Sequence, residues 1–591
     1  MRSNTGERPR EFELEGALAR FLAGEEAFKS RLEHLVRELP ASEADALMML
    51  MKESRGAWAL LLERSSGTVL FLGSALSGTP VALGTLGFDV VVLDASAARL
   101  GFAVARANAL VPGTTRAVLA GADAGLPFVD EAFDVVVVEG GLPSAATGWG
   151  FDMDEVRRVA REECVVTTDN RFGYKRSTGR RGIFRRDPRV LAREIVRPTR
   201  GEMGLVATRS AVAGDWNGAD AYSLYPHALE FSHVVALDAD RPRLTIGPRE
   251  RRNRVKMLGY RLGLFSLLTP SFAVHARRSP GRESRLDRLL DRIAEWTGEP
   301  RPQADVLVAT RSNDALVQTA VPGRTDAPGR WTIHIALQPA KRRMVQIHHD
   351  WLERVRERFP NVPVPEPLFL GRLEGADVAV ERRVGGLNGT DVTGDRPRTS
   401  RMFADAARRL VHLLEPAPVR FDEELYESLL GERFARVLGL IPSVTTRSNA
   451  ERIATEVRER LVGREMRLGV YHADLRAKHV QVDDDGALLG ILDWGASEPR
   501  FLPLIDLLHL VIHQRKQEEG GTFGDAWRAV RDGRTRTKDE GAVLEAYCAM
   551  AGVDEDVARV VLDAYPLLVA GMAERNWDYS RPDWVARQFG I

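Results

Sequence analysis

Along residues 68–170, short apolar runs alternate with segments in which apolar residues recur every three or four positions. The runs at 68–73, 89–94 and 133–140 predict strands, because a strand buried on both faces reads as a continuous apolar stretch. The intervening segments predict amphipathic helices. Regular alternation of strand and helix is typical of a doubly wound, mostly parallel α/β sheet, which binds ligands at the carboxyl ends of its strands.

The flanking regions have different patterns. Residues 1–62 show helical periodicity and predict a helical lead-in to a Rossmann-like domain at 63–277. Residues 283–385 predict a helix, then strands and a second helix, whereas residues 386–591 are mostly helical. The predicted fold is therefore a doubly wound α/β domain followed by a two-lobed α+β domain, with a small mixed lobe and a larger helical lobe.

Composition narrows the functional classes. The 591 residues include 83 Lys and Arg against 83 Asp and Glu, and a neutral chain is not expected to coat nucleic acid. The two cysteines, Cys164 and Cys548, exclude a disulfide framework and fit a cytoplasmic protein. The amino-terminal residues lack the apolar segment of a secretory signal, and no apolar stretch is long enough to predict a membrane span.

A turn of small residues joins the first two predicted strands. The first strand ends at Gly73, and Asp94 closes the next strand about 20 residues further on. Small residues let a ligand approach the main chain, and a carboxylate at this distance can accept hydrogen bonds from ribose hydroxyls. The spacing predicts a nucleoside-binding unit, although Ala75 stands where a further glycine is expected.

Two later segments extend this pattern. The sequence Ala-Asp-Ala-Gly-Leu-Pro-Phe at 122–128 follows the third predicted strand, and Phe-Asp-Val-Val at 133–136 begins the fourth. With them, residues 68–170 resemble the class I S-adenosylmethionine-dependent methyltransferases. The resemblance implies S-adenosylmethionine as cofactor and methyl transfer to an aligned nucleophile.

The same resemblance implies roles for individual residues. Gly73 and Ala75 would face the methionine moiety, Asp94 the ribose, and Asp123 with Ala124 the adenine. The sequence departs from the family at Phe71, where an acidic residue is usual, and at Ala75, where the middle glycine is usual.

A second constellation lies at 470–506. His472 and Asp474 follow a short apolar run, and Asp493 follows another. Two carboxylates on adjacent loops suit phosphoryl transfer, in which one orients the acceptor hydroxyl and the other holds magnesium against the nucleotide phosphates. The segment resembles the aminoglycoside phosphotransferase and choline kinase group, and this resemblance extends over roughly 283–580.

The resemblance implies ATP and Mg²⁺ as cofactors. Asp474 would be the catalytic base, Asp493 the principal magnesium ligand, and His472 a brace of the loop. The family's second metal ligand, an asparagine, is replaced by His479, whereas magnesium prefers oxygen ligands. The sequence fits both an active kinase and a degenerate scaffold.

The predicted small lobe also departs from the family. The position of the nucleotide-binding lysine is taken by His334, and Glu353 on the following helix is the candidate for its acidic partner. The loop at 310–315 contains no glycine. Adjacent helical positions do not share a face, so residues 348–350 are expected at the surface rather than in a metal cluster.

Together these patterns predict a bifunctional transferase. Its front half would methylate a hydroxyl of a sugar, glycan or small molecule, and its kinase-like half would phosphorylate a related acceptor. One alternative is a non-catalytic scaffold with a degenerate methyltransferase and a pseudokinase. Another is a kinase whose inactive methyltransferase serves as a partner-binding platform. No membrane or nucleic-acid partner is expected, and the oligomeric state is left open.

Overall fold

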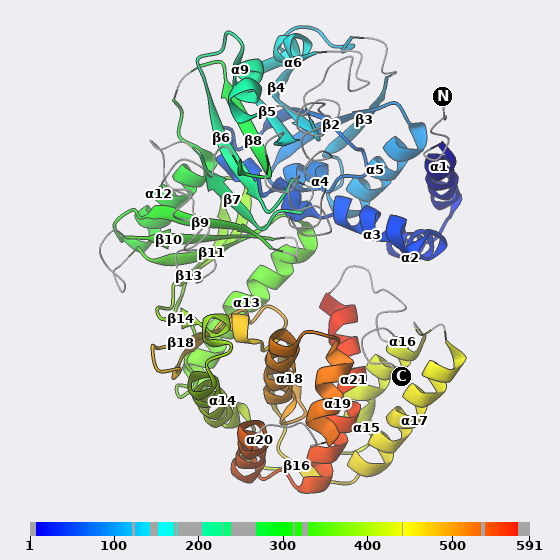
Figure 1. Cartoon of the computed structure of the whole chain (residues 1–591), viewed down its shortest axis with the longest axis vertical. Helices are drawn as coiled ribbons and strands as arrows, with labels where there is room; N and C mark the ends of the chain where they lie inside the picture. The colour runs from blue at the N-terminus through cyan, green and yellow to red at the C-terminus, as the bar shows by residue number, and fades with distance from the viewer. Residues whose placement is uncertain are drawn as a thin grey trace, which may run out of the picture. The chain divides into compact units, whose positions relative to one another are not determined.

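The computed structural model describes thirteen stretches of the chain. They are residues 8–120, 125–141, 152–170, 173, 204–228, 230–237, 268–279, 281–310, 314–321, 329–439, 441, 443–532 and 538–576. The chain divides into two compact units (Figure 1). The first comprises Met1–Val345 with Leu368–Val380, and the second comprises Gln346–Pro367 with Glu381–Ile591.

Parallel strands form the front part of the first unit. Their order is β3-β2-β1-β4-β5, and each neighbouring pair runs parallel. The direction of winding reverses between β1 and β4, which is the topological switch point where doubly wound sheets bind ligands. The bounds are β1 (Gly67–Leu72), β2 (Phe88–Asp94), β3 (Thr115–Leu119), β4 (Phe133–Glu139) and β5 (Ala160–Asp169), with helices α4 (Thr79–Thr85), α5 (Ala97–Leu110) and α6 (Met153–Val159).

The sheet continues beyond β5 in antiparallel fashion. Strand β8 (Ser271–Arg277) pairs with both β5 and β6 (Gly218–Tyr225), and β6 pairs with β7 (His233–Ala236). Strand β7 then pairs with β9 (Gln303–Ala309), placing His233 opposite Val308. Beyond β9 come β10 (Asp314–Ala320), β11 (Trp331–Ala336), β13 (Ala376–Arg382) and β12 (Pro367–Leu373), which completes a 13-stranded sheet.

One short helix packs against both the front strands and the small-lobe strands of this sheet. After α1 (Arg8–Ala23), α2 (Phe28–Glu38) and α3 (Ala41–Leu50), the 3₁₀ helix η1 (Glu53–Leu61) is buried along its whole length. It contacts α4 on one side, and α12 (Arg285–Thr297), β9 and β10 on the other. Trp58 and Leu60 share a core with Leu289, Ile293 and Ile333. The front sheet and the small mixed lobe therefore have a common interior.

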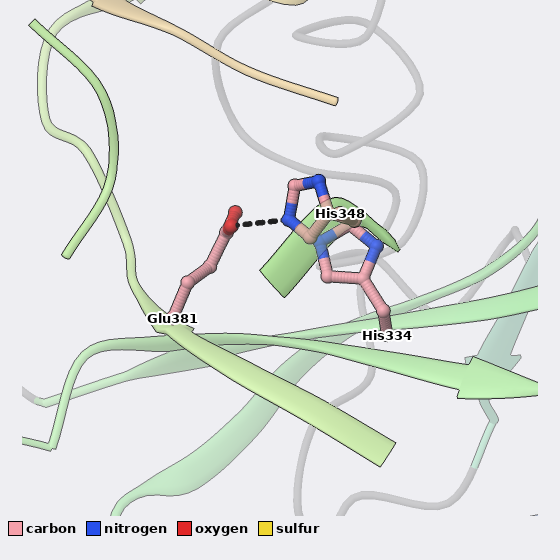
Figure 2. Close-up of side chains that lie close together, drawn as sticks. All are labelled: His334, His348 and Glu381. Carbon is pink, nitrogen blue, oxygen red and sulfur yellow. Dashed lines mark hydrogen bonds and ion pairs between the residues drawn. The ribbon is translucent and has the colours of Figure 1, made fainter. Parts of the chain in front are cut away.

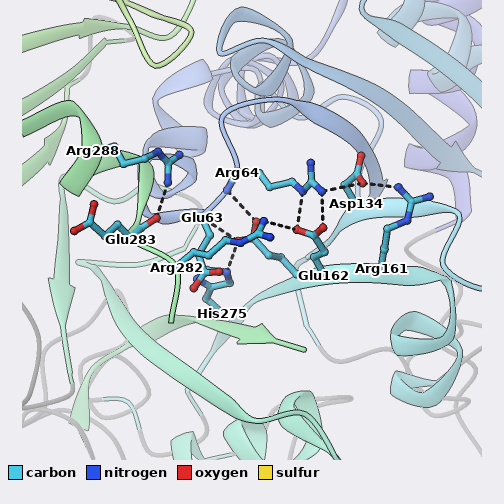
Figure 3. A network of polar contacts seen from close by, with 10 residues as sticks. Glu63, Arg64, Asp134, Arg161, Glu162, His275, Arg282, Glu283 and Arg288 are labelled. Carbon is cyan, nitrogen blue, oxygen red and sulfur yellow. Dashed lines mark hydrogen bonds and ion pairs between the residues drawn. The ribbon is translucent and has the colours of Figure 1, made fainter. Parts of the chain in front are cut away.

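A polar network lies at the amino-terminal edge of the parallel strands (Figure 3). The backbone N–H groups of Glu63 and Arg64 donate to the buried Glu163 carboxylate at 2.9 and 3.1 Å. His275 Nε2 lies 2.7 Å from the same carboxylate, and Arg64 Nε donates to Glu162 at 2.8 Å. Burial alone would raise the pKa of Glu163, but these contacts lower it below its ordinary value of 4.5. The network fixes the chain after η1 to β5 and β8.

The second unit is mainly helical. Within it lie most of α13 (Pro339–Arg358), followed by α14 (Arg396–Leu410), α15 (Glu423–Tyr426), α16 (Glu432–Gly439), α17 (Val444–Leu461), α18 (Ile505–Glu519), α19 (Phe523–Asp532), α20 (Lys538–Ala551) and α21 (Glu555–Asn576). Its described residues form three small sheets: β14 (Leu387–Asn388) with β18 (Val480–Val482) and β19 (Leu488–Ile491), β17 (Gly469–Tyr471) with β20 (Glu498–Phe501), and β15 (Val419–Arg420) with β16 (Glu465–Met466). The predicted class is confirmed: a doubly wound α/β sheet is followed by a mixed small lobe and a helical lobe.

The search for membrane spans covered the described part of the chain, and none of its helices combines the length and apolar character needed to cross a bilayer.

Replacing Glu163 tests the polar network. Glu163→Gln should lower the free energy of unfolding by about 3 kcal/mol at neutral pH, because it disrupts a buried hydrogen-bonded pair. The pKa of Glu163 is lower in the folded protein than the unfolded value of 4.5, so its ionised form stabilises the fold above that pH. This stabilisation is lost as the pH falls through the folded-state pKa. The difference between wild type and variant in chemical denaturation should therefore shrink on acidification below that value. Glu162→Gln, on a half-exposed side chain, is the matched control, and an equal effect of both substitutions would contradict the assignment.

Candidate functional site

Three side chains predicted to act together converge in the second unit. Asp474 follows β17, His479 ends the 3₁₀ turn η7 (Ala477–His479), and Asp493 follows β19. One candidate ligand atom from each residue lies within 4.8 Å of the other two. This grouping arises because β18 and β19 pair as neighbours, which brings the loops at 472–479 and 492–495 together.

His472 and Asp506 brace the first loop. Asp506, on α18, accepts the backbone N–H groups of His472 and Ala473 at 2.8 and 3.1 Å. His472 Nε2–H donates to the Leu492 carbonyl at 2.8 Å, and its Nδ1 accepts the N–H of Asp474 at 3.4 Å. Burial lowers the pKa of His472 and raises that of Asp506 to about 7. The neutral imidazole thus links the loop of Asp474 to the strand that leads to Asp493.

Backbone strain is concentrated in the same two loops. Ala473 has φ +68° and Asp493 has φ +62°, both in the left-handed region. This conformation costs roughly 1–2 kcal/mol for a residue with a Cβ atom. Such strain persists only where the surrounding structure imposes it, and the two hydrogen bonds to Asp506 impose it at Ala473.

Asp474 lies among positively charged or polarised groups. Arg476 forms an ion pair with one carboxylate oxygen, and His509 Nε2 lies 3.6 Å from the other. Burial alone would raise the pKa of Asp474, but His509, His479 and Arg476 together hold it well below its usual range. Asp474 is therefore an anion at neutral pH, able to accept a hydrogen bond from a hydroxyl but weak as a base.

His479 has a defined tautomer. Its Nδ1 lies 2.6 Å from the backbone carbonyl of Asp474, which can only accept, so Nδ1 carries the proton. Its Nε2 lies 3.1 Å from Asp493 Oδ2, and burial lowers the pKa of His479 to about 3. In the neutral ring a nitrogen lone pair then faces a carboxylate, an arrangement that a cation between them would complete.

These residues fit a divalent ion. Asp493 carries a lowered pKa, so it offers a charged oxygen ligand, and its side chain is 52 % exposed, which leaves a solvent-facing side for a nucleotide. Asp474 offers a second oxygen and His479 a nitrogen. A donor set that includes an imidazole suits a borderline transition ion better than magnesium, which prefers oxygen alone.

The expectation that residues 348–350 lie at the surface is wrong for the two histidines. His348 is buried, and its Nε2–H donates to Glu381 at 2.7 Å (Figure 2). Its Nδ1 accepts the N–H of Trp494, the residue after Asp493, at 3.0 Å. The sequence did contain a signal, because His348 lies at helical spacing between the buried Val345 and Leu352.

Glu353, five residues further along α13, is placed differently from His348. Its side chain is 62 % exposed and pairs with His349 at 3.6 Å. His348, rather than Glu353, is thus the α13 residue that contacts the loop of Asp493. The predicted cofactor-binding role of Glu353 stays a prediction, and His334 lies on β11 as the sequence suggested.

The front sheet holds the other predicted site residues. Gly73 and Ala75 lie in the turn after β1, and both are buried. Asp94, at the end of β2, accepts hydrogen bonds from Ser96 N at 2.9 Å, Ala75 N at 3.4 Å and Arg99 Nε at 3.2 Å. Each of its two oxygens thus accepts at least one hydrogen bond from the chain. Asp123 and Ala124 lie outside the described residues.

The space beside Gly73 is also filled. A Cβ atom placed on Gly73 would lie 3.0 Å from both the Phe71 ring and the Glu139 side chain. Glu139, at the end of β4, accepts hydrogen bonds from Arg55 at 2.7 Å and from Thr79 at 3.0 Å. Among the described residues, the turn therefore does not fit S-adenosylmethionine, and we derive no chemical step through that cofactor.

Comparison with known proteins assigns a class to the second site. Residues 324–539 match the sequence model of the phosphotransferase enzyme family, so this region is a kinase-like phosphotransferase domain, as the catalytic-loop pattern predicted. No curated protein shows significant sequence similarity to this chain.

Solved structures similar to the chain include phosphotransferases and methyltransferases. An aminoglycoside-3'-phosphotransferase of type VIII is 17 % identical over 44 % of this chain and 88 % of its own, with a TM-score of 0.28. A SAM-dependent methyltransferase from Aquifex aeolicus is 16 % identical over 24 % of this chain and 73 % of its own, with a TM-score of 0.18. A geranyl diphosphate C-methyltransferase from Streptomyces coelicolor A3(2) is 13 % identical over 44 % and 88 %, with a TM-score of 0.23.

His348→Ala tests whether α13 positions the loop of Asp493. Removing the imidazole leaves the Trp494 N–H and the Glu381 carboxylate without this partner, so the loop should lose its fixed geometry. We expect Mn²⁺ affinity, measured by calorimetry, to fall about tenfold, as is common when a residue that orients metal ligands is lost. His349→Ala on the same helix is the control. Unchanged affinity in a folded His348→Ala protein would contradict the role.

Proposed function

We propose that the C-terminal domain transfers a phosphoryl group from a metal-bound nucleoside triphosphate to a hydroxyl of a small-molecule or glycan acceptor. The observation that carries the proposal is the convergence of Asp474, His479 and Asp493 within 4.8 Å. The match of residues 324–539 to the phosphotransferase enzyme family supports it. Methyl transfer by the front half is not included, because Asp94 and the turn at Gly73 are occupied by the chain itself.

Asp493, His479 and Asp474 have different roles in this reaction. Asp493 and His479 would hold the ion, which neutralises charge on the transferred phosphate when bound. Asp474 accepts a hydrogen bond from the acceptor hydroxyl and directs its oxygen at the γ-phosphorus. An oxygen–phosphorus bond to the acceptor forms as the bond from the γ-phosphorus to the bridging oxygen breaks, and the nucleoside diphosphate leaves. The hydroxyl proton passes to Asp474 late, because its depressed pKa makes it a weak base.

A pseudokinase is the second candidate, favoured by the 3.1 Å contact between His479 Nε2 and Asp493 Oδ2. If a proton resides on Nε2, the imidazolium takes the position of the metal and the pair becomes an internal ion pair. Such a domain would bind nucleotide without a metal dependence, or bind none. The two candidates differ in whether a divalent ion can displace that proton.

Metal titration of the full chain separates them. With ATP present, we expect Mn²⁺ to bind at least tenfold more tightly than Mg²⁺, because imidazole is a good ligand for the former and a poor one for the latter. His479→Asn should reverse the preference by supplying an oxygen ligand, and Asp493→Asn should weaken both ions. Calorimetry or Mn²⁺ resonance measures the binding directly. Absence of binding by either ion would overturn the proposal in favour of the pseudokinase.

A further inference from the structure

The carboxyl ends of β1 and β4 mark the place where a doubly wound sheet binds its ligand. In this chain that place is filled by the segment at 51–58. The segment comprises the two residues that link α3 to η1 and most of η1 itself. We propose that the 51–58 segment is a permanent internal occupant of the crevice. The front half then binds no S-adenosylmethionine and serves as the structural base of the small mixed lobe.

The crevice contains a buried ion pair. Arg55 Nη2 lies 2.7 Å from Glu139, and the Thr79 hydroxyl donates to the same oxygen at 3.0 Å. The two charged side chains are only 4 % and 9 % exposed. An incoming cofactor would have to separate a buried, hydrogen-bonded ion pair, and leaving one buried charge without its partner is strongly unfavourable.

The glycine-containing turn contacts protein rather than open space. Gly78 N–H donates to the Leu50 carbonyl at 2.8 Å. A Cβ atom on Gly78 would lie 2.3 Å from the Lys52 carbonyl, and one on Gly56 would lie 2.5 Å from the Ala82 side chain. At both positions the missing side chain permits contact between two parts of this chain. The small residues that suggested a cofactor turn therefore also explain the docking of the 51–58 segment.

A second buried ion pair holds the beginning of the segment. Glu53 pairs with Arg106 of α5, and both side chains are almost completely buried. Arg106 also donates to the Met51 carbonyl. The segment is thus fixed to α5 through Met51 and Glu53, and to β4 through Arg55.

The apolar side of the segment explains why it is not a removable lid. Residues 57–61 of η1, Trp58 among them, lie in the core formed with α12, β9, β10 and β11. Moving the segment out of the crevice would open that core and expose several large apolar side chains to water, which is unfavourable. The same residues therefore close the ligand position and join the front sheet to the small lobe.

Calorimetry on the full chain tests the proposal with S-adenosylhomocysteine and sinefungin as probes. We expect no saturable binding at ligand concentrations up to about 1 mM, the weak end of specific affinities. Saturable binding of either probe that Asp94→Asn weakens would overturn the proposal. Failure of this proposal would leave the phosphotransfer proposal untouched, because that proposal is tested by ion binding at Asp493 and His479.

Hydrogen exchange provides a readout that does not depend on ligand. Amides of η1 that lie in the shared core should exchange as slowly as those of β1 and β4, because they open only with the core. Fast exchange in η1 with slow exchange in the strands would identify a lid and overturn the proposal. Arg55→Ala should lower the thermal midpoint by several degrees, whereas Arg282→Ala, on a side chain that is 72 % exposed, should not. Equal midpoints for wild type and Arg55→Ala would contradict the role of this ion pair.

Discussion

Burial of η1 is the constraint on which the first unit depends. A nine-residue helix with no exposed face must satisfy every charge it carries, and it does so through Glu53 with Arg106 and Arg55 with Glu139. Its apolar residues at the same time supply the interior on which β9 to β11 pack. Because both sheet regions pack on the same helix, they share one core, while a second cluster around Leu70 and Val136 belongs to the front sheet alone. The backbone pairing of β7 with β9 makes the two regions one sheet.

The second unit is organised around a different constraint, the fixed tautomer of His479. The backbone carbonyl of Asp474 determines which ring nitrogen carries the proton, and the paired strands β18 and β19 determine what the other nitrogen faces. Buried bracing groups, His472 and Asp506 on one side and His348 on the other, hold the loops in strained conformations. A single substitution relative to the family pattern, histidine for asparagine, therefore changes the expected chemistry of the ion without changing the fold.

Much of this architecture was predictable from local patterns. The strands β1, β2 and β4 were recognised because their apolar runs are continuous, and the loop of Asp474 because its residues are contiguous in sequence. The pairing of β7 with β9 was not predictable, since strand pairing between distant segments leaves no periodic signal. The roles of Arg55 and His348 were missed for a related reason. Each is a polar residue with polar neighbours in sequence, and its partner, Glu139 or Glu381, is brought close only by the fold.

The front half thus has a ligand position that we propose its own residues occupy, and the second half carries the residues that we propose transfer a phosphoryl group. A crystal structure of the full chain grown with both S-adenosylhomocysteine and Mn²⁺–ATP tests this division most directly. The account predicts electron density for the nucleotide and ion at Asp474, His479 and Asp493, with Arg55 still paired to Glu139. Density for S-adenosylhomocysteine at the end of β1, with Arg55 displaced, would contradict it.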